Sequence, residues 1–259
     1  MRDKRLHPKV LKVAIGIPNE GHTLPESYDN HLIVSFHLGT MQEKWKYEKR
    51  DPCYEFYWFT TGRLLTPIAR EKLLEEAIKG EMDYLFMYDD DMVLPIDMFE
   101  AMLKDMEDHP EIDVLAPLAF MRNPPHFPVI YNAKEGYDKK LHTRYVINQV
   151  VKNYPKDKLI EVEATGFGAV CVRMSIIQKM QEPYFFNLTR SGEDIHFCFK
   201  ARHEADARIF VDTRIKLGHL ANPQIVDEEY YEKYIKDNDI ELPDVPHRYN
   251  LYGKDEPSD

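Results

Sequence analysis

The sequence contains no apolar run that approaches eighteen residues, and its first eight residues are charged, without an apolar stretch. A transmembrane helix needs about 20 apolar residues and a secretory signal needs an apolar core, so neither is visible. Cysteine is scarce as well, because Cys53, Cys171 and Cys198 are the only three and lie far apart. This spacing argues against a disulfide scaffold and favours a reducing compartment. We therefore expect a cytoplasmic protein, with peripheral membrane contact left open.

Basic residues are in the minority, since 34 Lys and Arg face 45 Asp and Glu for a net charge of −11. A general nucleic-acid binder needs a basic surface, so that class is excluded. The 17 prolines and 11 glycines are not pooled in a linker, and no fixed-period repeat is present. We expect one elaborated domain over residues 1–225, with a C-terminal helix and tail over 226–259 packed on it.

Strand and helix signals alternate through the first half of the chain. VLKVAIGI (10–17) is a β-branched run that stops at Pro18, and YLFMY (84–88) is a continuous apolar run with the length of a buried strand. Between them, Thr66-Pro67 predicts an N-cap and first turn, and Gly80 ends a helix over 67–79. A further helix after Pro95 and a strand at 114–116 complete an α/β pattern with a mainly parallel sheet.

The second half is less regular. Residues 120–160 show weak periodicity and are predicted to form loops or an irregular insertion near a substrate. EVEATGFGAVCVR (161–173) predicts strand, glycine turn and strand, and SIIQ (175–178) is a capping-box signature for a short helix. Beyond these we expect a helix opened by SGED (191–194), a strand at 209–211 that runs on to Gly218-His219, and an amphipathic helix over 226–238.

Three adjacent carboxylates, Asp89, Asp90 and Asp91, follow the buried run at 84–88. Like charges at a strand end repel one another unless a cation neutralises them, so a metal is the natural partner. Hard oxygen ligands suit Mg²⁺, Mn²⁺ or Ca²⁺, and an added imidazole favours Mn²⁺. The alternative is a solvated acidic turn.

Four other residues are candidates for chemistry. Arg70 lies on the apolar stripe of its helix, either to meet a ligand or to extend its head group to water. Glu193 and Asp194 begin a helix, where a carboxylate can accept a proton from a hydroxyl or simply favour the helix dipole. His219 follows a strand and is a candidate third metal ligand, although single histidines are usually packed or solvated.

The order of these signals over residues 10–220 resembles the GT-A class of glycosyltransferases, especially the large inverting family two. The matching pieces are VAIGIPNEG (13–21), ARE (69–71), DYLFMYDDDM (83–92), TGFGAVCVR (165–173), SGEDIHFCFKAR (191–202) and VDTRIKLGH (211–219). The resemblance implies a Rossmann-like three-layer α/β/α sandwich with a mainly parallel central sheet and a C-terminal helical extension.

The resemblance also implies a role for each motif. Asp89 and Asp91 would be the carboxylates of the DxD motif, contacting ribose and metal, with Asp90 between them, and His219 would complete the site for Mn²⁺ or Mg²⁺. Asp194 would be the catalytic base and Glu193 its neighbour at the acceptor or sugar. The remaining donor-binding residues would be Pro18, Asn19 and Glu20 after the first strand, Arg70 at the nucleotide or diphosphate, and Gly166 with Gly168 in a turn close to the donor sugar.

We therefore expect transfer of a sugar from a UDP- or GDP-type donor to a hydroxyl of a glycan, lipid or protein. Two departures from the family are the long aromatic segment 21–62 and Glu71, which stands where an asparagine is common. Retaining enzymes of the same fold remain an alternative. A sugar-phosphate nucleotidyltransferase would need a glycine-rich basic loop that IGIPNEGHTLPE lacks, and a non-catalytic nucleotide- or metal-binding module is the third alternative. A homo-oligomer is left open.

Overall fold

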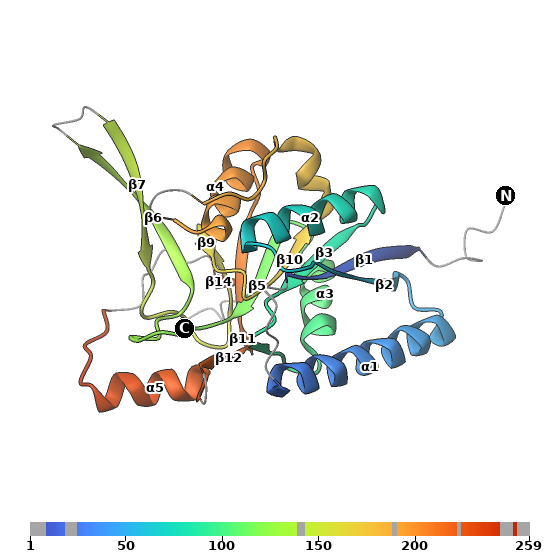
Figure 1. Ribbon diagram of the computed structural model, residues 1–259, viewed down its shortest axis with the longest axis horizontal. Helices are drawn as coiled ribbons and strands as arrows, with labels where there is room; N and C mark the ends of the chain where they lie inside the picture. Colours follow the sequence, from blue (N-terminus) through green and yellow to red (C-terminus); the bar gives the residue numbers. More distant parts are fainter. Residues whose placement is uncertain are drawn as a thin grey trace, which may run out of the picture.

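The computed structural model describes residues 9–18, 25–138, 143–187, 191–221, 224–243 and 251–252. Its centre is an eight-stranded sheet in the order β14, β8, β11, β5, β10, β3, β1, β2 (Figure 1). The bounds are Val10–Ile17 for β1, Cys53–Thr60 for β2, Tyr84–Tyr88 for β3, Val114–Leu118 for β5, Leu159–Val162 for β8, Ala169–Arg173 for β10, Ile209–Lys216 for β11 and Leu251–Tyr252 for β14. Only β8 and β10 of this sheet run against the others, so most strands share one direction.

Helices cover both faces of the sheet. Helices α2 (Thr66–Lys79) and α4 (Glu193–Ala205) pack on one face, whereas α1 (Pro25–Glu48) and α3 (Met98–Asp108) pack on the other (Figure 1). Each face has its own hydrophobic cluster, and burial of one aliphatic or aromatic side chain contributes about 1.5–3 kcal/mol before entropy is subtracted. The predicted three-layer α/β/α sandwich with a mainly parallel sheet is therefore confirmed.

Strand β3 fixes the position of the acidic triplet that follows it. All five of its residues are buried, and the strand lies between β1 and β10 in the middle of the sheet. Gly16 of β1 is in register with Met87, so Pro18 and Asp89 leave the sheet side by side. The two predicted core strands, 10–17 and 84–88, have the bounds expected from the sequence.

Two three-stranded sheets flank the main one. The first joins β4 (Met92–Val93), β12 (Gly218–Ala221) and β13 (Gln224–Val226), and helix α5 (Glu228–Asp237) follows it. The second joins β7 (Thr143–Val150), β6 (Ile130–Asp138) and β9 (Ala164–Thr165). In Figure 1 the β6–β7 hairpin stands out from the body of the molecule.

The prediction of loops or an irregular insertion over 120–160 was therefore wrong for 130–138 and 143–150, which form the strands β6 and β7, whereas 121–129 and 151–158 belong to no helix or named strand. A two-stranded ribbon bonds mainly to itself and need not alternate apolar and polar residues against a core, so the periodicity that reveals a buried strand is absent. The 24-residue helix α1 was not predicted from the sequence either. It carries apolar side chains on its exposed side as well as on its buried side. Apolar residues on both sides of a helix obscure its period.

Two predicted caps differ in detail. Helix α2 begins at Thr66 with Leu65 as its N-cap, and no side chain caps it, because the leucine side chain has no acceptor atom. Pro67 in the first turn also lacks one of the N–H groups that a cap would satisfy. Ser175 lies inside the 3-10 helix η1 (Met174–Lys179), which begins directly after β10 with Arg173 as N-cap. Among the described helices, none combines the length and apolarity needed to cross a membrane. The division between 1–225 and 226–259 stays a prediction.

Candidate functional site

Arg70 connects three segments that are far apart in the chain. Its Nη2 donates to Asp89 Oδ1 at 2.7 Å and to the Phe167 carbonyl at 3.1 Å, and its Nη1 donates to Glu193 Oε1 at 2.5 Å. The residue is only 2% exposed, so the inward position predicted from the helical stripe is confirmed and the head group does not extend to water. The end of β3, the glycine turn and the start of α4 are thereby joined by one guanidinium.

The electrostatics of this cluster are those of a buried, compensated charge. Burial alone would lower the pKa of Arg70, but the carboxylates of Asp89 and Glu193 outweigh it and the pKa is raised. Burial raises the pKa of Asp89 to about 6, against the opposing effect of Arg70. A buried ion pair of this kind is strongly destabilising to break, because the remaining charge is left without its partner.

Asp91 faces the imidazole of His219 and the guanidinium of Arg122. Its Oδ2 lies 3.2 Å from His219 Nε2 and 3.1 Å from Arg122 Nη1. The small sheet explains the meeting, because His219 of β12 is in register with Met92 of β4 and the Leu220 N–H donates to the Asp91 carbonyl at 3.0 Å. Two residues 128 positions apart are thus brought together by backbone pairing.

The tautomer of His219 follows from its second contact. Its Nδ1 lies 2.8 Å from the Phe120 carbonyl, which can only accept, so Nδ1 carries a proton. Nε2 then faces the Asp91 carboxylate with either a second proton or a lone pair available to a cation. Burial lowers the pKa of His219, but the hydrogen bond to Asp91, the charge of that carboxylate and the hydrogen bond to Phe120 together outweigh this effect, and the pKa is raised. Burial raises the pKa of Asp91, yet His219 and Arg122 bring it below its ordinary value.

The Asp91–His219 pair fits a divalent cation. A metal-bound histidine usually donates its other ring N–H to a carbonyl or carboxylate, and His219 has that arrangement with Phe120. Within the described part of the chain, however, no three His, Cys, Asp or Glu side chains form a ready metal site. Asp89 bonds to Arg70 instead of joining Asp91 and His219, so further ligands would have to come from the substrate or from water.

Asp194 lies at the start of α4, beside Glu193. Its Oδ1 accepts the Ile195 N–H at 2.7 Å, and a Cβ at Gly192 would come within 2.6 Å of the same oxygen, so glycine leaves room for the carboxylate. Burial raises the pKa of Asp194, and Arg70 opposes the rise. The pKa of Tyr131 is raised to about 12 by burial and by the nearby charge of Asp194. A carboxylate with a raised pKa is a better proton acceptor than an ordinary one.

The glycine turn between β9 and β10 is packed against protein atoms. A Cβ at Gly166 would lie 3.0 Å from the Val129 side chain, and one at Gly168 would lie 2.1 Å from the Met92 methyl group. The Gly168 carbonyl also accepts the Asp89 N–H at 2.9 Å. Because these two residues are glycines, Val129 and Met92 have room to pack against the turn. The turn also holds the backbone of Asp89 through the Gly168 carbonyl.

The other predicted residues are placed as follows. Pro18 is buried at the end of β1, Asp90 is half-buried between its neighbours, and Asn19 and Glu20 lie outside the described residues. Arg122 was missed by the sequence analysis. Only its position could have indicated a role, because Arg122 follows β5 closely, at the same carboxyl edge of the sheet as the acidic triplet.

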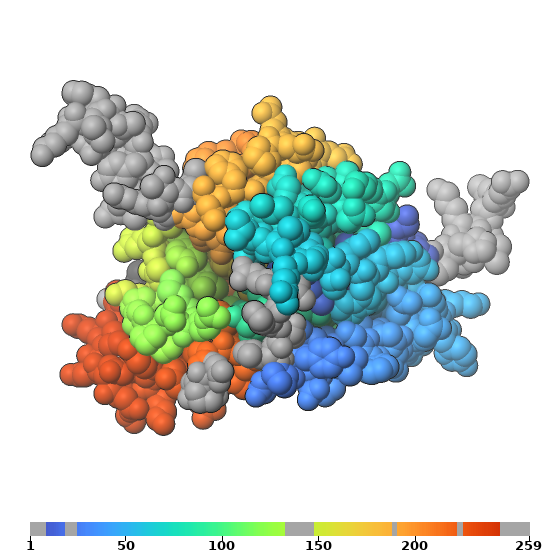
Figure 2. Space-filling model, viewed as in Figure 1, coloured from blue at the N-terminus to red at the C-terminus, as the bar shows by residue number. Residues whose placement is uncertain are grey.

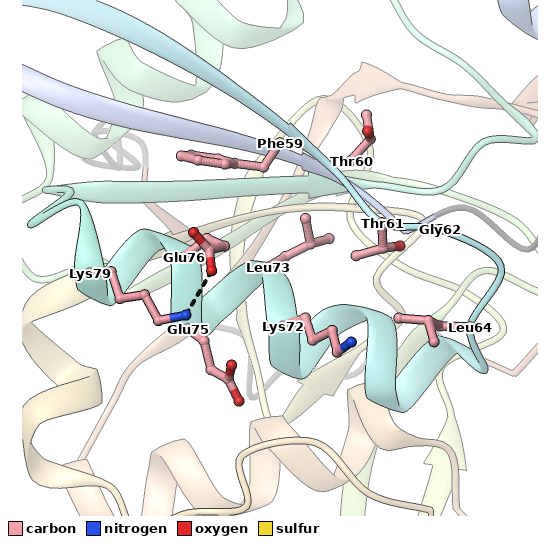
Figure 3. Close-up of a pocket in the computed structure, with 10 residues that line it drawn as sticks. All are labelled: Phe59, Thr60, Thr61, Gly62, Leu64, Lys72, Leu73, Glu75, Glu76 and Lys79. Carbon is pink, nitrogen blue, oxygen red and sulfur yellow. Dashed lines mark hydrogen bonds and ion pairs between the residues drawn. The ribbon is translucent and has the colours of Figure 1, made fainter.

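A cavity of about 460 Å³ lies between the end of β2 and the side of α2 (Figure 3). Phe59, Thr60 and Gly62 line its strand side, and Lys72 and the Glu76–Lys79 ion pair line its helix side. None of the residues predicted to act in the site lines this cavity. It is therefore a separate groove along the sheet edge.

No protein-family model and no curated protein matches the chain. Among solved structures it is similar to A197 from STIV, at 15% identity and a TM-score of 0.50, over 92% of this chain and 100% of that one. It is also similar to S. aureus TarS 1–349 in complex with UDP-GlcNAc (14% identity, TM-score 0.41, 78% of this chain and 56% of that one). UDP-glucose pyrophosphorylase complexed with UDP-glucose matches at 7% identity and a TM-score of 0.46, over 88% and 98% of the two chains. These likenesses concern the fold alone.

Proposed function

We propose that this chain is a metal-dependent glycosyltransferase that moves a sugar from a UDP- or GDP-type donor to an acceptor hydroxyl. The observation that carries the proposal is the Asp91–His219 pair, 3.2 Å apart, with the imidazole oriented by the Phe120 carbonyl. The pair lies at the carboxyl edge of a mainly parallel sheet, where α/β proteins bind their ligands. The resemblance of the motif order to the inverting GT-A enzymes supports the same assignment.

Asp91 and His219 would hold Mn²⁺ or Mg²⁺. A divalent ion bound there would neutralise the charge that develops on the departing diphosphate. Arg122 is exposed over about half of its side chain, so it can turn from Asp91 toward a diphosphate oxygen when an ion takes its place. Asp89, fixed by Arg70, would present its remaining oxygen to the ribose.

Asp194 would take the proton from the acceptor hydroxyl. Its pKa is raised by burial, and its carboxylate makes no direct ion pair with Arg70, unlike that of Glu193. Glu193 would instead fix the position of Arg70 and, through the shared guanidinium, that of Asp89. This assignment makes Asp194 the base and Glu193 a positioning residue, and it corresponds to direct displacement with inversion.

The test is calorimetric titration of UDP and GDP into the protein with and without Mn²⁺. We expect one nucleotide to bind at least about tenfold more tightly when Mn²⁺ is present, which corresponds to 1.4 kcal/mol. His219→Ala should abolish that gain, and the exposed control Lys104→Ala on α3 should retain it. Equal binding with and without metal, for both nucleotides, would overturn the proposal. NMR of the product anomer then distinguishes inversion from retention.

A further inference from the structure

Helix α1 carries an exposed apolar surface that nothing in the described chain covers. Tyr28, Leu32, Ile33 and Phe36 are 59%, 44%, 58% and 71% exposed. Spacings of four residues (28 to 32 and 32 to 36) and of three (33 to 36) put these side chains on one side of the helix. The opposite side of the same helix is the one that packs on the sheet. Figure 2 shows α1, in blue, forming one edge of the molecule. Large apolar side chains grouped on an edge helix mark an interaction surface.

We propose that this surface binds a second copy of the chain through an antiparallel pairing of two α1 helices. The α1 surface consists of Tyr28, Leu32, Ile33 and Phe36 together with the residues that continue its outward stripe, Asp29, Gly39, Thr40, Lys44 and Tyr47. Its charges support this partner, because Asp29 lies near one end and Lys44 near the other. Neither residue takes part in an ion pair within the described part of the chain.

An antiparallel two-fold arrangement makes the surface complementary to itself. In a dimer whose two-fold axis passes beside Phe36, Asp29 of each copy lies opposite Lys44 of the other. Ile33 then lies opposite Thr40, and the two Phe36 rings lie next to each other. Gly39 adds to the fit, because a Cβ there would meet nothing within 4 Å and the bare backbone leaves space for a large side chain of the other copy. Glu43, another charge on this side, is paired with Lys46 at 3.5 Å.

The charge of the chain disfavours a lipid surface as the occupant. The net charge is −11, and the apolar part of the stripe is flanked by Glu26 and Asp29, which an anionic bilayer surface repels. In the antiparallel helix pair, Asp29 of each copy instead faces Lys44 of the other.

Sedimentation of the whole chain over a range of concentrations tests the proposal. We expect a reversible dimer whose dissociation constant rises at least about tenfold in Phe36→Glu, and stays unchanged in the control Ile78→Glu, which changes an exposed apolar residue of α2. Asp29→Lys and Lys44→Glu should each weaken the dimer, and the double variant should restore it. A chain that stays monomeric at every concentration, or a double variant no better than the single ones, would overturn the proposal.

Cross-linking separates the antiparallel pairing from a parallel one. The native cysteines are all buried, so an introduced surface thiol reacts alone. Phe36→Cys should form a disulfide between copies, whereas Tyr47→Cys should not, because antiparallel helices hold the two positions about 30 Å apart. Cross-linking at position 47 with none at 36 would contradict the geometry. Binding of phosphatidylserine vesicles that Phe36→Glu abolishes, without dimer formation, would assign the surface to membranes instead.

Discussion

Arg70 and Glu193 are 123 positions apart in the chain, yet their side chains meet at 2.5 Å inside the protein. The same guanidinium bonds to Asp89 at 2.7 Å. The acidic motif after β3 and the acidic start of α4 are therefore coupled, because Asp89 and Glu193 share the guanidinium of Arg70 as their cation.

Removal of Arg70 should destabilise the fold. Arg70→Met leaves Asp89 and Glu193 without their cation, and breaking a buried ion pair costs about 3–5 kcal/mol in the free energy of unfolding. Urea unfolding followed by circular dichroism measures the loss. The triple variant with Asp89→Asn and Glu193→Gln should recover most of it, since the orphaned charges are gone. A loss below about 1 kcal/mol in Arg70→Met would contradict the compensating role of the arginine.

The two outer aspartates should differ in their effect on metal binding. Asp91→Asn removes the carboxylate that faces His219, so Mn²⁺ affinity should fall at least about tenfold. Asp89→Asn changes a side chain held by Arg70, and should weaken nucleotide binding with little effect on the affinity for Mn²⁺ alone. Electron paramagnetic resonance of free Mn²⁺ in titrations measures both. Equal losses in the two variants would place Asp89 among the direct ligands.

Arg122 should compete with the cation and assist the nucleotide. In Arg122→Ala the Asp91 carboxylate loses its guanidinium partner, which competes with the ion, so Mn²⁺ alone should bind several-fold more tightly. UDP or GDP in the presence of Mn²⁺ should bind more weakly, because a charge-assisted hydrogen bond to phosphate is lost. The same titrations report both effects. Changes of the same sign would show that Arg122 does not exchange partners.

Asp194→Asn should separate binding from transfer. The amide keeps the shape of the side chain but cannot accept the proton, so kcat should fall by about 10²–10⁴ while donor affinity is retained. Glu193→Gln should instead lower the free energy of unfolding, through Arg70, with a smaller effect on kcat. A coupled assay of nucleotide release gives kcat and KM. Unchanged turnover in Asp194→Asn would exclude it as the base.

The pH dependence of stability should carry a contribution from Asp105. Burial, and then the neighbouring Asp212 carboxylate, raise its pKa to about 6, with Arg214 opposing. The folded state therefore favours the protonated form, so this group adds stability as pH falls through 6 toward its unfolded value near 4. The free energy of unfolding should rise over that interval by about 1–3 kcal/mol more in the parent than in Asp105→Asn. Parallel pH curves for the two proteins would refute this.

The sequence was informative where a residue type and its position pointed to the same feature. Five apolar residues followed by three aspartates located a central strand and its carboxyl edge, and a charge on an apolar stripe located Arg70. The position of His219 after a strand and the family resemblance both suggested that it joins the metal site. Its contact with Asp91 depends on the register of β4 and β12, two short strands that the sequence analysis did not predict. Arg122 and the partners of Arg70 depend on three-dimensional packing that no local pattern encodes.

Helix α5 packs against the segments that carry Arg122 and His219. His126 lies edge-on against Tyr230 and Tyr234 of this helix, and its Nδ1 contacts the carbonyl of Met121, next to Arg122. Through β13, the same C-terminal segment pairs with the strand that holds His219. Arg122 and His219, which both face Asp91, are thus supported by the segment that contains β13 and α5. A recombinant fragment that stopped at residue 225 would keep the acidic motif but lose the contacts that support Arg122 and His219.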